Sequence, residues 1–254
     1  MTVGALVRNE ARLLRHDPLP AVVLIAMPIV LMSLLTPALR VALRFEGYAD
    51  ATGAEQTVPG MVSVFSYFAV AVVGFALFRE HGWRTWWRLR AVGASPGQLL
   101  VAKLALPAGM LAAQHVVLFG FGTTVLDLRV AGSWAALALV SVAFVAMVVA
   151  LGLAAAAALD TIQQVNAVTN LGAMVIGGFG GGFVPVDVLP SWVQPLAPAS
   201  PTYWAMDGYR AVILRGGGLT DVVTPVLVLA AFAVLFALVA LWRLQLDAPK
   251  RTWG

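Results

Sequence analysis

Residues 133–159 read SWAALALVSVAFVAMVVALGLAAAAAL and contain no Asp, Glu, Lys, Arg or His. A helix needs about 20 mainly apolar residues to cross the hydrocarbon core of a bilayer. This stretch is longer than that, and it offers no charged face to water. We therefore expect a transmembrane helix here, which sets the class of the whole chain.

The overall composition supports the same class. Of the 254 residues, 61% are hydrophobic and 11% are charged, whereas a soluble domain carries about 25% charged residues. So few charges cannot cover a water-facing surface. The chain has no cysteine, which excludes disulfides, iron–sulfur clusters and cysteine-ligated zinc.

Six stretches are long and apolar enough to span a membrane. We expect an all-α polytopic membrane protein with six transmembrane helices, forming a single domain over residues 1–254. The fifth stretch is glycine-rich, and five spans plus a re-entrant segment is the alternative. The predicted spans are 19–39, 58–78, 99–126, 133–159, 165–184 and 222–242.

The basic residues predict the orientation. With the N-terminus inside, eleven Lys and Arg residues fall on the inner side and five on the outer side. Positive residues favour the cytoplasmic side, so both termini are predicted to be cytoplasmic. No basic tract with interleaved aromatic residues is of the kind that follows a phosphate backbone, and most Lys and Arg residues flank the apolar stretches, so nucleic acid is not an expected partner.

Residues 1–17 have the pattern of an amphipathic interface helix that precedes the first span. Arg8, Arg12 and Arg15 share one side of a helix, and Val3, Leu6 and other apolar residues share the opposite side. Such a helix lies in the headgroup layer with its arginines toward lipid phosphates. The alternative is a solvated leader with chance periodicity.

The segment 79–97 is richer in tryptophan and arginine than a simple connection needs. Tryptophan and arginine dominate the energetics of protein–protein interfaces, so a short helix here could dock into a partner. An interfacial helix anchored in headgroups is an equally good interpretation. The tryptophans are Trp83, Trp86 and Trp87, and the arginines are Arg79, Arg84, Arg88 and Arg90.

A glycine-rich run at 177–182 leads into a proline-rich segment that stays apolar and aromatic. Glycines let helices approach closely, and prolines interrupt a continuous span. We expect short extracytoplasmic re-entrant helices and a loop over 185–220. The glycine run is not a nucleotide-binding loop, because no Gly-Lys-Ser/Thr follows it.

Residues that could carry catalysis are sparse. His16, His81 and His115 have no metal-ligand partner at helical spacing. His115 lies in the third predicted span, where bonding to a neighbouring helix is the favoured role. No Walker A loop is present, so any ATP-driven motor must be a partner. We expect no enzyme activity and no metal site in this chain.

The chain resembles the ABC-2 type permease family, which includes drug-resistance and polysaccharide exporters, over nearly its whole length. One motif is Arg-Glu-x-Gly at 79–82, followed by Arg-Leu-Arg-Ala-x-Gly-Ala-Ser-Pro at 88–96. A second runs from the glycine-rich span through Phe-Val-Pro at 183–185 and Leu-Pro-x-Trp at 189–192 to Tyr-Arg at 209–210. Trp83 stands where many members have Thr or Ser, which leaves open how this segment would align on a partner.

The resemblance implies that 79–97 is a cytoplasmic coupling helix seated on an ABC ATPase subunit pair. It also implies pairing with a second permease copy or homologue around a translocation path, in the cytoplasmic membrane of a bacterium. ATP and Mg²⁺ would be bound by the partner ATPase, with no cofactor in this chain. The implied coupling residues are Glu80, Gly82, Trp83, Arg84, Trp86, Trp87, Arg88 and Arg90.

We expect the permease subunit of an ABC exporter for a hydrophobic or amphiphilic substrate (a drug, antibiotic or lipid), as in multidrug export or antibiotic resistance. The alternatives are a permease that exports a polysaccharide or glycolipid, and a motor-free membrane scaffold or enzyme. Aromatic residues of the second and fifth spans could receive an amphiphile, although ordinary packing or lipid contact explains them equally well. They are Phe65, Tyr67, Phe68, Phe75 and Phe179.

Overall fold

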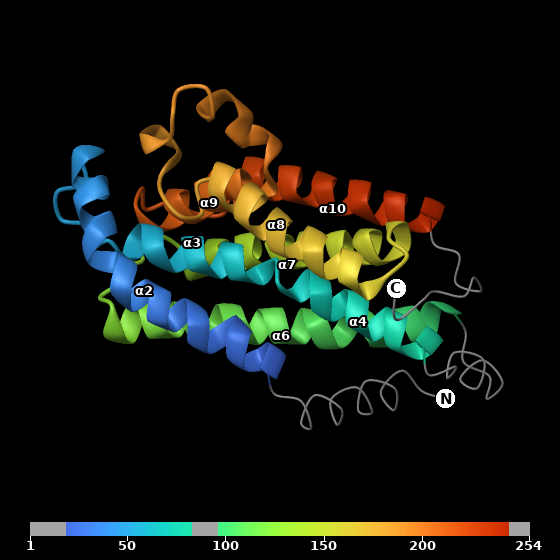
Figure 1. Ribbon diagram of the computed structural model, residues 1–254. Coiled ribbons are helices and arrows are strands. Elements are labelled where there is room, and N and C mark those ends of the chain that lie inside the picture. Colours follow the sequence, from blue (N-terminus) through green and yellow to red (C-terminus); the bar gives the residue numbers. More distant parts are fainter. Residues whose placement is uncertain (1–18, 83–95, 244–254) are drawn as a thin grey trace.

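The computed structural model describes residues 19–82 and 96–243, and the regular elements in these ranges are helices (Figure 1). The predicted interface helix at 1–17 and most of the predicted coupling segment lie outside the described residues. In chain order the helices are α2 Leu19–Phe45, α3 Ala54–Ser66, α4 Ala69–Gly82, α6 Pro96–Val125, α7 Trp134–Ala158, α8 Ile162–Phe179, η1 Val186–Val188, η2 Gln194–Ala199, α9 Pro201–Ile213, η3 Thr220–Val222 and α10 Val223–Arg243.

Within the described residues, five helical stretches are long and apolar enough to cross a membrane. They coincide with the first four predicted spans and the last one, which confirms an all-helical chain built mainly of potential spans. Their bounds are Val22–Phe45, Ala54–Phe78, Gly97–Val125, Trp134–Ala158 and Thr220–Arg243.

The predicted fifth span corresponds to α8, which is not among these five. This helix has 18 residues, or about 27 Å at 1.5 Å per residue, and its first half is rich in glutamine and asparagine. It starts at a capping box made by Thr161 and Gln164. The predicted end at residue 184 is wrong, because Gly181 adopts a left-handed conformation with φ of 82° and ends the helix earlier.

The second span is two helices rather than the single helix that the sequence predicts. Between α3 and α4 the backbone tightens, with Phe68 N donating to Phe65 O at 3.1 Å and Val70 N donating to Tyr67 O at 2.9 Å. These bonds connect residues three apart, as in a 3₁₀ turn. We call the segment 67–68 the break.

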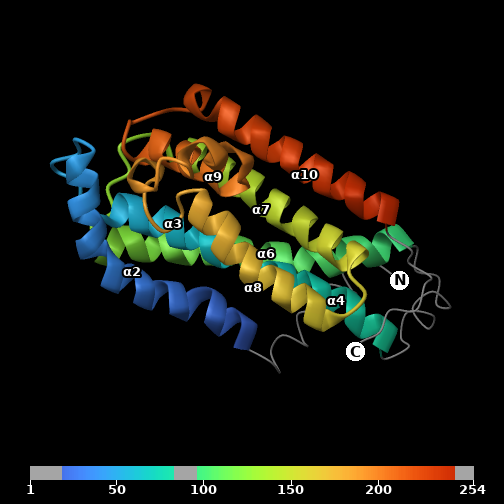
Figure 2. The same ribbon diagram turned by 45° about the horizontal axis from the view of Figure 1, so that its top comes forward.

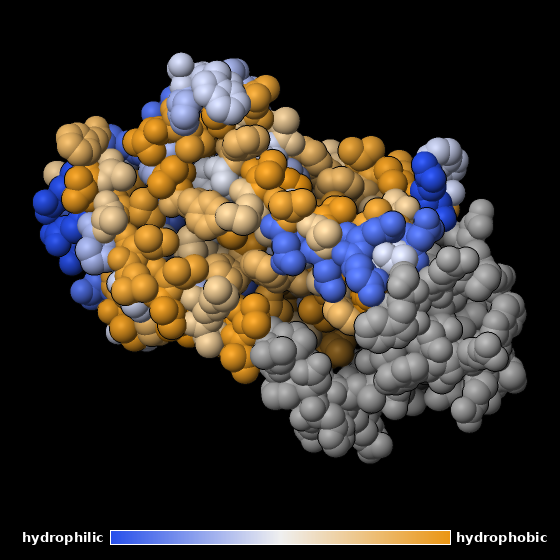
Figure 3. Space-filling model, viewed as in Figure 1, coloured by the Kyte–Doolittle hydropathy of each residue, from blue (hydrophilic) through white to orange (hydrophobic). Residues whose placement is uncertain are grey.

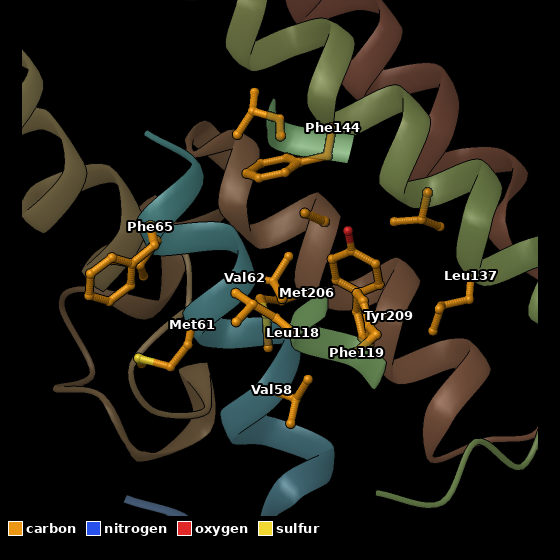
Figure 4. Close-up of a cluster of buried hydrophobic side chains, with 14 of the residues drawn as sticks. Val58, Met61, Val62, Phe65, Leu118, Phe119, Leu137, Phe144, Met206 and Tyr209 are labelled. Carbon is orange, nitrogen blue, oxygen red and sulfur yellow. The ribbon is translucent and has the colours of Figure 1, made fainter. Parts of the chain in front are cut away.

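Every residue of α3 is buried, which makes this helix the centre of the bundle. It packs against α2, α6, α8 and α9, while α7 runs alongside both α4 and α10 (Figure 2). Figure 4 shows the main cluster of buried side chains, to which α3, α6, α7 and α9 contribute. A second cluster surrounds α4 and includes Val73, Leu77 and Phe78. The two halves of the second span, α3 and α4, thus contribute mainly to different clusters. Ala69 and Val70, at the start of α4, still belong to the main cluster.

The two ends of the bundle differ. The chain leaves α4 and enters α6 at one end, where α10 also ends (Figure 1). We call this the α4–α6 end. The opposite end carries α9 and the short helices η1 and η2, and we call it the α9 end. The predicted extracytoplasmic segment 185–220 is located there.

Candidate functional site

The predicted coupling segment connects α4 directly to α6. Glu80 lies in the last turn of α4, Gly82 is its final residue, and Pro96 begins α6. The remaining predicted coupling residues, Trp83, Arg84, Trp86, Trp87, Arg88 and Arg90, lie outside the described residues. A force applied to this connection would therefore act first on α4 and α6.

Tyr67 lies at the break and connects it to two other helices. Its hydroxyl shares a hydrogen bond of 2.8 Å with Oγ1 of Thr202, near the start of α9. Its ring meets the ring of Phe144 in α7 edge-on, with centroids 5.9 Å apart. Both hydroxyl-bearing side chains are buried, so each satisfies the other. The break is thereby linked to α9 and α7.

The α3 half of the second span is held tightly by the glycine turn at 180–182. The side-chain nitrogen of Gln56 donates to the carbonyl of Gly181 at 2.8 Å. Gly60 approaches the same turn so closely that a Cβ at this position would lie 2.0 Å from the carbonyl oxygen of Gly182. Such contact is possible only without a side chain at position 60. The turn and α3 therefore pack as one unit.

Ser200 connects the start of α9 to the end of α8. Its hydroxyl accepts from Thr202 N at 3.2 Å as an N-cap and donates to the carbonyl of Ile176 at 2.7 Å. Pro201 follows at the first helical position, where its missing N–H costs nothing. Together with Tyr67, this arrangement fixes α9 against α3 and α8.

A cavity of about 680 Å³ lies at the α9 end, between the end of α2, the 180–187 turn and one face of α9. Its volume is in the range of small-molecule sites. The lining residues are Phe45, Glu46, Tyr48, Gln56, Gly180, Gly181, Pro185, Val186, Asp187, Gln194, Tyr203, Met206, Asp207, Arg210 and Arg215.

Two ion pairs line this cavity. Glu46, just after α2, pairs with Arg210 of α9, and both side chains are largely buried, at 11% and 14% exposed. Arg215 pairs with Asp207 at 2.9 Å on a more exposed part of the rim. The first pair joins the first span to α9 across 164 residues of sequence.

The five aromatic residues predicted for the substrate path do not gather in one place. Phe65 and Tyr67 are buried in the main cluster, and the ring of half-buried Phe68 lies 5.5 Å from that of Phe65. Phe75 and Phe179 are 50% and 39% exposed. Only the last two have a substantially exposed surface in a single copy of the chain. A role in lining a path stays a prediction.

Sequence reasoning missed the pair of Glu46 with Arg210 and the bond of Tyr67 with Thr202. In the sequence, Arg210 stands out as a topology signal and as part of the Tyr-Arg pair at 209–210, and Tyr67 as an aromatic residue of the predicted path. The partners are separated by 164 and 135 residues, so no local spacing indicates either contact.

The described residues include no group of three His, Cys, Asp or Glu that could hold a metal ion. Nδ1 of buried His115 lies 2.8 Å from the carbonyl of Leu111 in its own helix, so Nδ1 carries the proton. The expected hydrogen bond to a neighbouring helix is wrong. The contact with α7 is instead made by the rings of His115 and Phe144, whose centroids are 6.4 Å apart.

Comparison with known proteins agrees with this architecture. The linearmycin resistance permease protein LnrN of Bacillus subtilis (strain 168) is 34% identical over 92 residues, which cover 36% of this chain and 24% of that relative. The chain thus matches about a quarter of the length of this relative. The family model described as "ABC-2 type transporter" matches residues 2–214, which is most of the chain. The chain therefore belongs to the ABC-2 type transporter family, a family of multi-pass membrane transport subunits.

Proposed function

We propose that this chain is the membrane-spanning permease of an ATP-driven exporter that moves a hydrophobic or amphiphilic substrate out of a bacterial cell. The substrate would be a drug, an antibiotic or a lipid, and a separate pair of ABC ATPase subunits would bind ATP and Mg²⁺. Family membership and the similarity to a resistance permease support this proposal. Under it, the α4–α6 end faces the cytoplasm and α8 is the fifth of six spans.

The observation that carries the mechanism is the mechanical connection from the 83–95 segment to α9. That segment continues into α4, α4 meets α3 at the break, and the break is bonded to α9 through Tyr67 and Thr202. Because α4 and α3 contribute to different packing clusters, they can tilt relative to each other with limited repacking. Closure of the ATPase pair would tilt α4 and open the α9 end.

The exposed surface of α8 favours a second copy of the permease. Gln163, Gln164 and Asn170 are exposed on this helix, and Figure 3 shows a hydrophilic patch over its first half, next to an apolar surface. Polar side chains at membrane depth usually face protein or a water-filled path rather than lipid. We infer that this face of α8 meets the second copy or lines the path between copies.

Co-expression with candidate ABC ATPase subunits from the same genome tests the proposal. We expect the two proteins to co-purify, and we expect amphiphiles to stimulate ATP hydrolysis in proteoliposomes and to accumulate on the far side of the membrane. Stimulation by lipid-linked glycans alone would point to a polysaccharide or glycolipid exporter. A chain that purifies without any ATPase and transports nothing would contradict the exporter assignment and favour a scaffold.

A further inference from the structure

We propose that the cavity at the α9 end binds a primary ammonium group carried on an apolar tail. The cavity is lined by five separate stretches of the chain, within 45–48, 56, 180–187, 194 and 203–215, and none of the predicted path residues lines it. The proposal concerns ligand binding alone and does not require an ATPase.

The charges of the cavity favour a cation. Both of its arginines are already neutralised, Arg210 by Glu46 and Arg215 by Asp207. The remaining lining charge is Asp187, which is exposed and whose carboxylate has no hydrogen bond or ion pair within the described residues. An added cation therefore meets an unpaired carboxylate, whereas an added anion would have to displace an existing partner.

Asp187 is held in place by its own backbone. The side-chain nitrogen of Gln194 donates to the carbonyl oxygens of Asp187 at 3.2 Å and of Leu189 at 2.9 Å. These bonds fix the backbone of the short η1 helix at the rim, so the Cα of Asp187 keeps its place beside the cavity while its exposed carboxylate can turn toward a ligand.

The unsatisfied polar atoms of the cavity walls indicate an N–H donor. Oε1 of Glu46 and Oε1 of fully buried Gln56 have no hydrogen-bond partner in the described part of the chain. Both residues line the cavity, and both orphan atoms are acceptors. A primary ammonium offers three donors and no acceptor, whereas a quaternary ammonium offers no N–H at all. Both oxygens are covered in the ligand-free chain, so a ligand reaches them only when the side chain of Glu46 or Gln56 turns toward it, and only a cation that carries N–H groups would stabilise that turn.

The rest of the lining suits an aromatic contact and an apolar tail. Phe45, Tyr48 and Tyr203 contribute rings, and rings attract cations through their negative faces. Val186 and Met206 add apolar surface beside them. One chemistry fits both the charged and the apolar parts: an amphiphile whose headgroup is a primary amine. An ethanolamine lipid of the adjoining leaflet and an exported amine are two sources of this group.

Binding to the purified full-length chain in phosphatidylcholine nanodiscs tests the proposal. The probes are radiolabelled dodecylamine, dodecyltrimethylammonium and dodecanol, and empty nanodiscs correct for partition into lipid. Of the three probes, we expect only dodecylamine to bind saturably. The Kd for dodecylamine should be about tenfold higher in the variant Asp187→Asn, which lacks the exposed carboxylate at the rim. Asp127→Asn is the matched control, because it removes one negative charge outside the cavity at a left-handed position that asparagine tolerates.

Equal binding of dodecyltrimethylammonium or dodecanol would overturn the proposal, as would wild-type affinity in Asp187→Asn. Nanodiscs that contain phosphatidylethanolamine distinguish the two sources of the amine, a lipid headgroup and a soluble exported amine. Competition with dodecylamine assigns the site to the lipid headgroup, and its absence assigns it to a soluble amine. Since no ATPase is present, these results are independent of the exporter assignment.

Discussion

Tyr67 and Thr202 are 135 residues apart in the sequence, yet their side-chain oxygens lie 2.8 Å apart in the bundle. One residue sits at the break in the second span and the other in the first turn of α9. This hydrogen bond joins the break in the second span directly to α9. Its strength therefore bears on both folding and motion.

Removing the hydroxyl of Tyr67 or of Thr202 is expected to destabilise the protein, because the remaining hydroxyl loses its hydrogen-bond partner. Tyr67→Phe and Thr202→Val should each lower the free energy of unfolding by about 1 kcal/mol, because each leaves one buried hydroxyl without its partner. The double variant should cost less than the sum of the two. Unfolding in mixed micelles measures this coupling. Strict additivity would mean that the bond contributes nothing.

Thr124→Val is the matched control for that cycle. Among the described residues, the hydroxyl of Thr124 bonds only to the carbonyl of Gly120 in its own helix, at 2.8 Å. Combined with Tyr67→Phe, it should give additive effects.

Gly60→Ala should prevent normal folding or cost about 3 kcal/mol or more, since its Cβ would lie 2.0 Å from the backbone of Gly182. Backbone cannot move aside as a flexible side chain can. Gly109→Ala is the control, because this helical glycine has no atom within 4 Å of a built Cβ. It should be neutral or slightly stabilising. Thermal melting of both variants measures the difference, and equal melting temperatures would contradict the close approach.

Much of the fold could be predicted from the sequence, because lipid imposes strong composition rules on a span. The stretch 133–159 matches α7, Trp134–Ala158, almost residue for residue. The break at 67–68 could not be predicted, since its residues are as apolar and aromatic as those around them. The end of α8 was misplaced because a glycine run is compatible with both a packed helix and a left-handed turn.

The candidate site was less predictable than the fold. The cavity brings together side chains from the end of α2 to residue 215, and none of their spacings forms a motif. Glu46 lies in a turn and Asp187 in the short η1 helix, and at such surface positions a carboxylate usually faces water. Only the three-dimensional arrangement distinguishes the paired Glu46 from the unpaired Asp187.

Breaking the largely buried ion pair is expected to matter more than breaking the exposed one. Glu46→Gln should lower the free energy of unfolding by about 2–3 kcal/mol, because it leaves Arg210 charged and without its partner. Asp207→Asn removes the more exposed partner of Arg215 and should cost less than about 1 kcal/mol. Chemical unfolding at low and moderate salt measures both. An equal cost for the two variants would mean that burial of the first pair has no energetic weight.

Trp86→Ala and Arg90→Ala test the coupling segment. Each should weaken binding of the ATPase subunits by at least about tenfold, since tryptophan and arginine anchors commonly contribute more than 1.4 kcal/mol to an interface. Trp242→Ala on α10 is the control, because this tryptophan is 79% exposed and outside the segment. Titration of the ATPase onto reconstituted permease measures the affinity. Unchanged affinity and stimulation would rule out this segment as the docking site.

Cysteine cross-linking can test the pairing of two permeases without background, because the chain contains no cysteine. Leu171→Cys and Met174→Cys place thiols on the exposed face of α8, where these side chains are 67% and 68% exposed. We expect a short bismaleimide to form a covalent dimer in native membranes at both positions. The reason is that nearby Asn170 is exposed on the same helix, and an uncovered amide at membrane depth is unfavourable in lipid.

Leu238→Cys on α10 is the matched control. It is 57% exposed, and the large exposed side chains around it, such as Leu235 and Leu241, are apolar. That surface suits lipid directly, so its thiol should stay monomeric under the same conditions. Cross-linking through α10 but not through α8 would place the second copy on the other side of the bundle. The polar residues of α8 would then need a different cover, and the path between paired copies could not run along this helix.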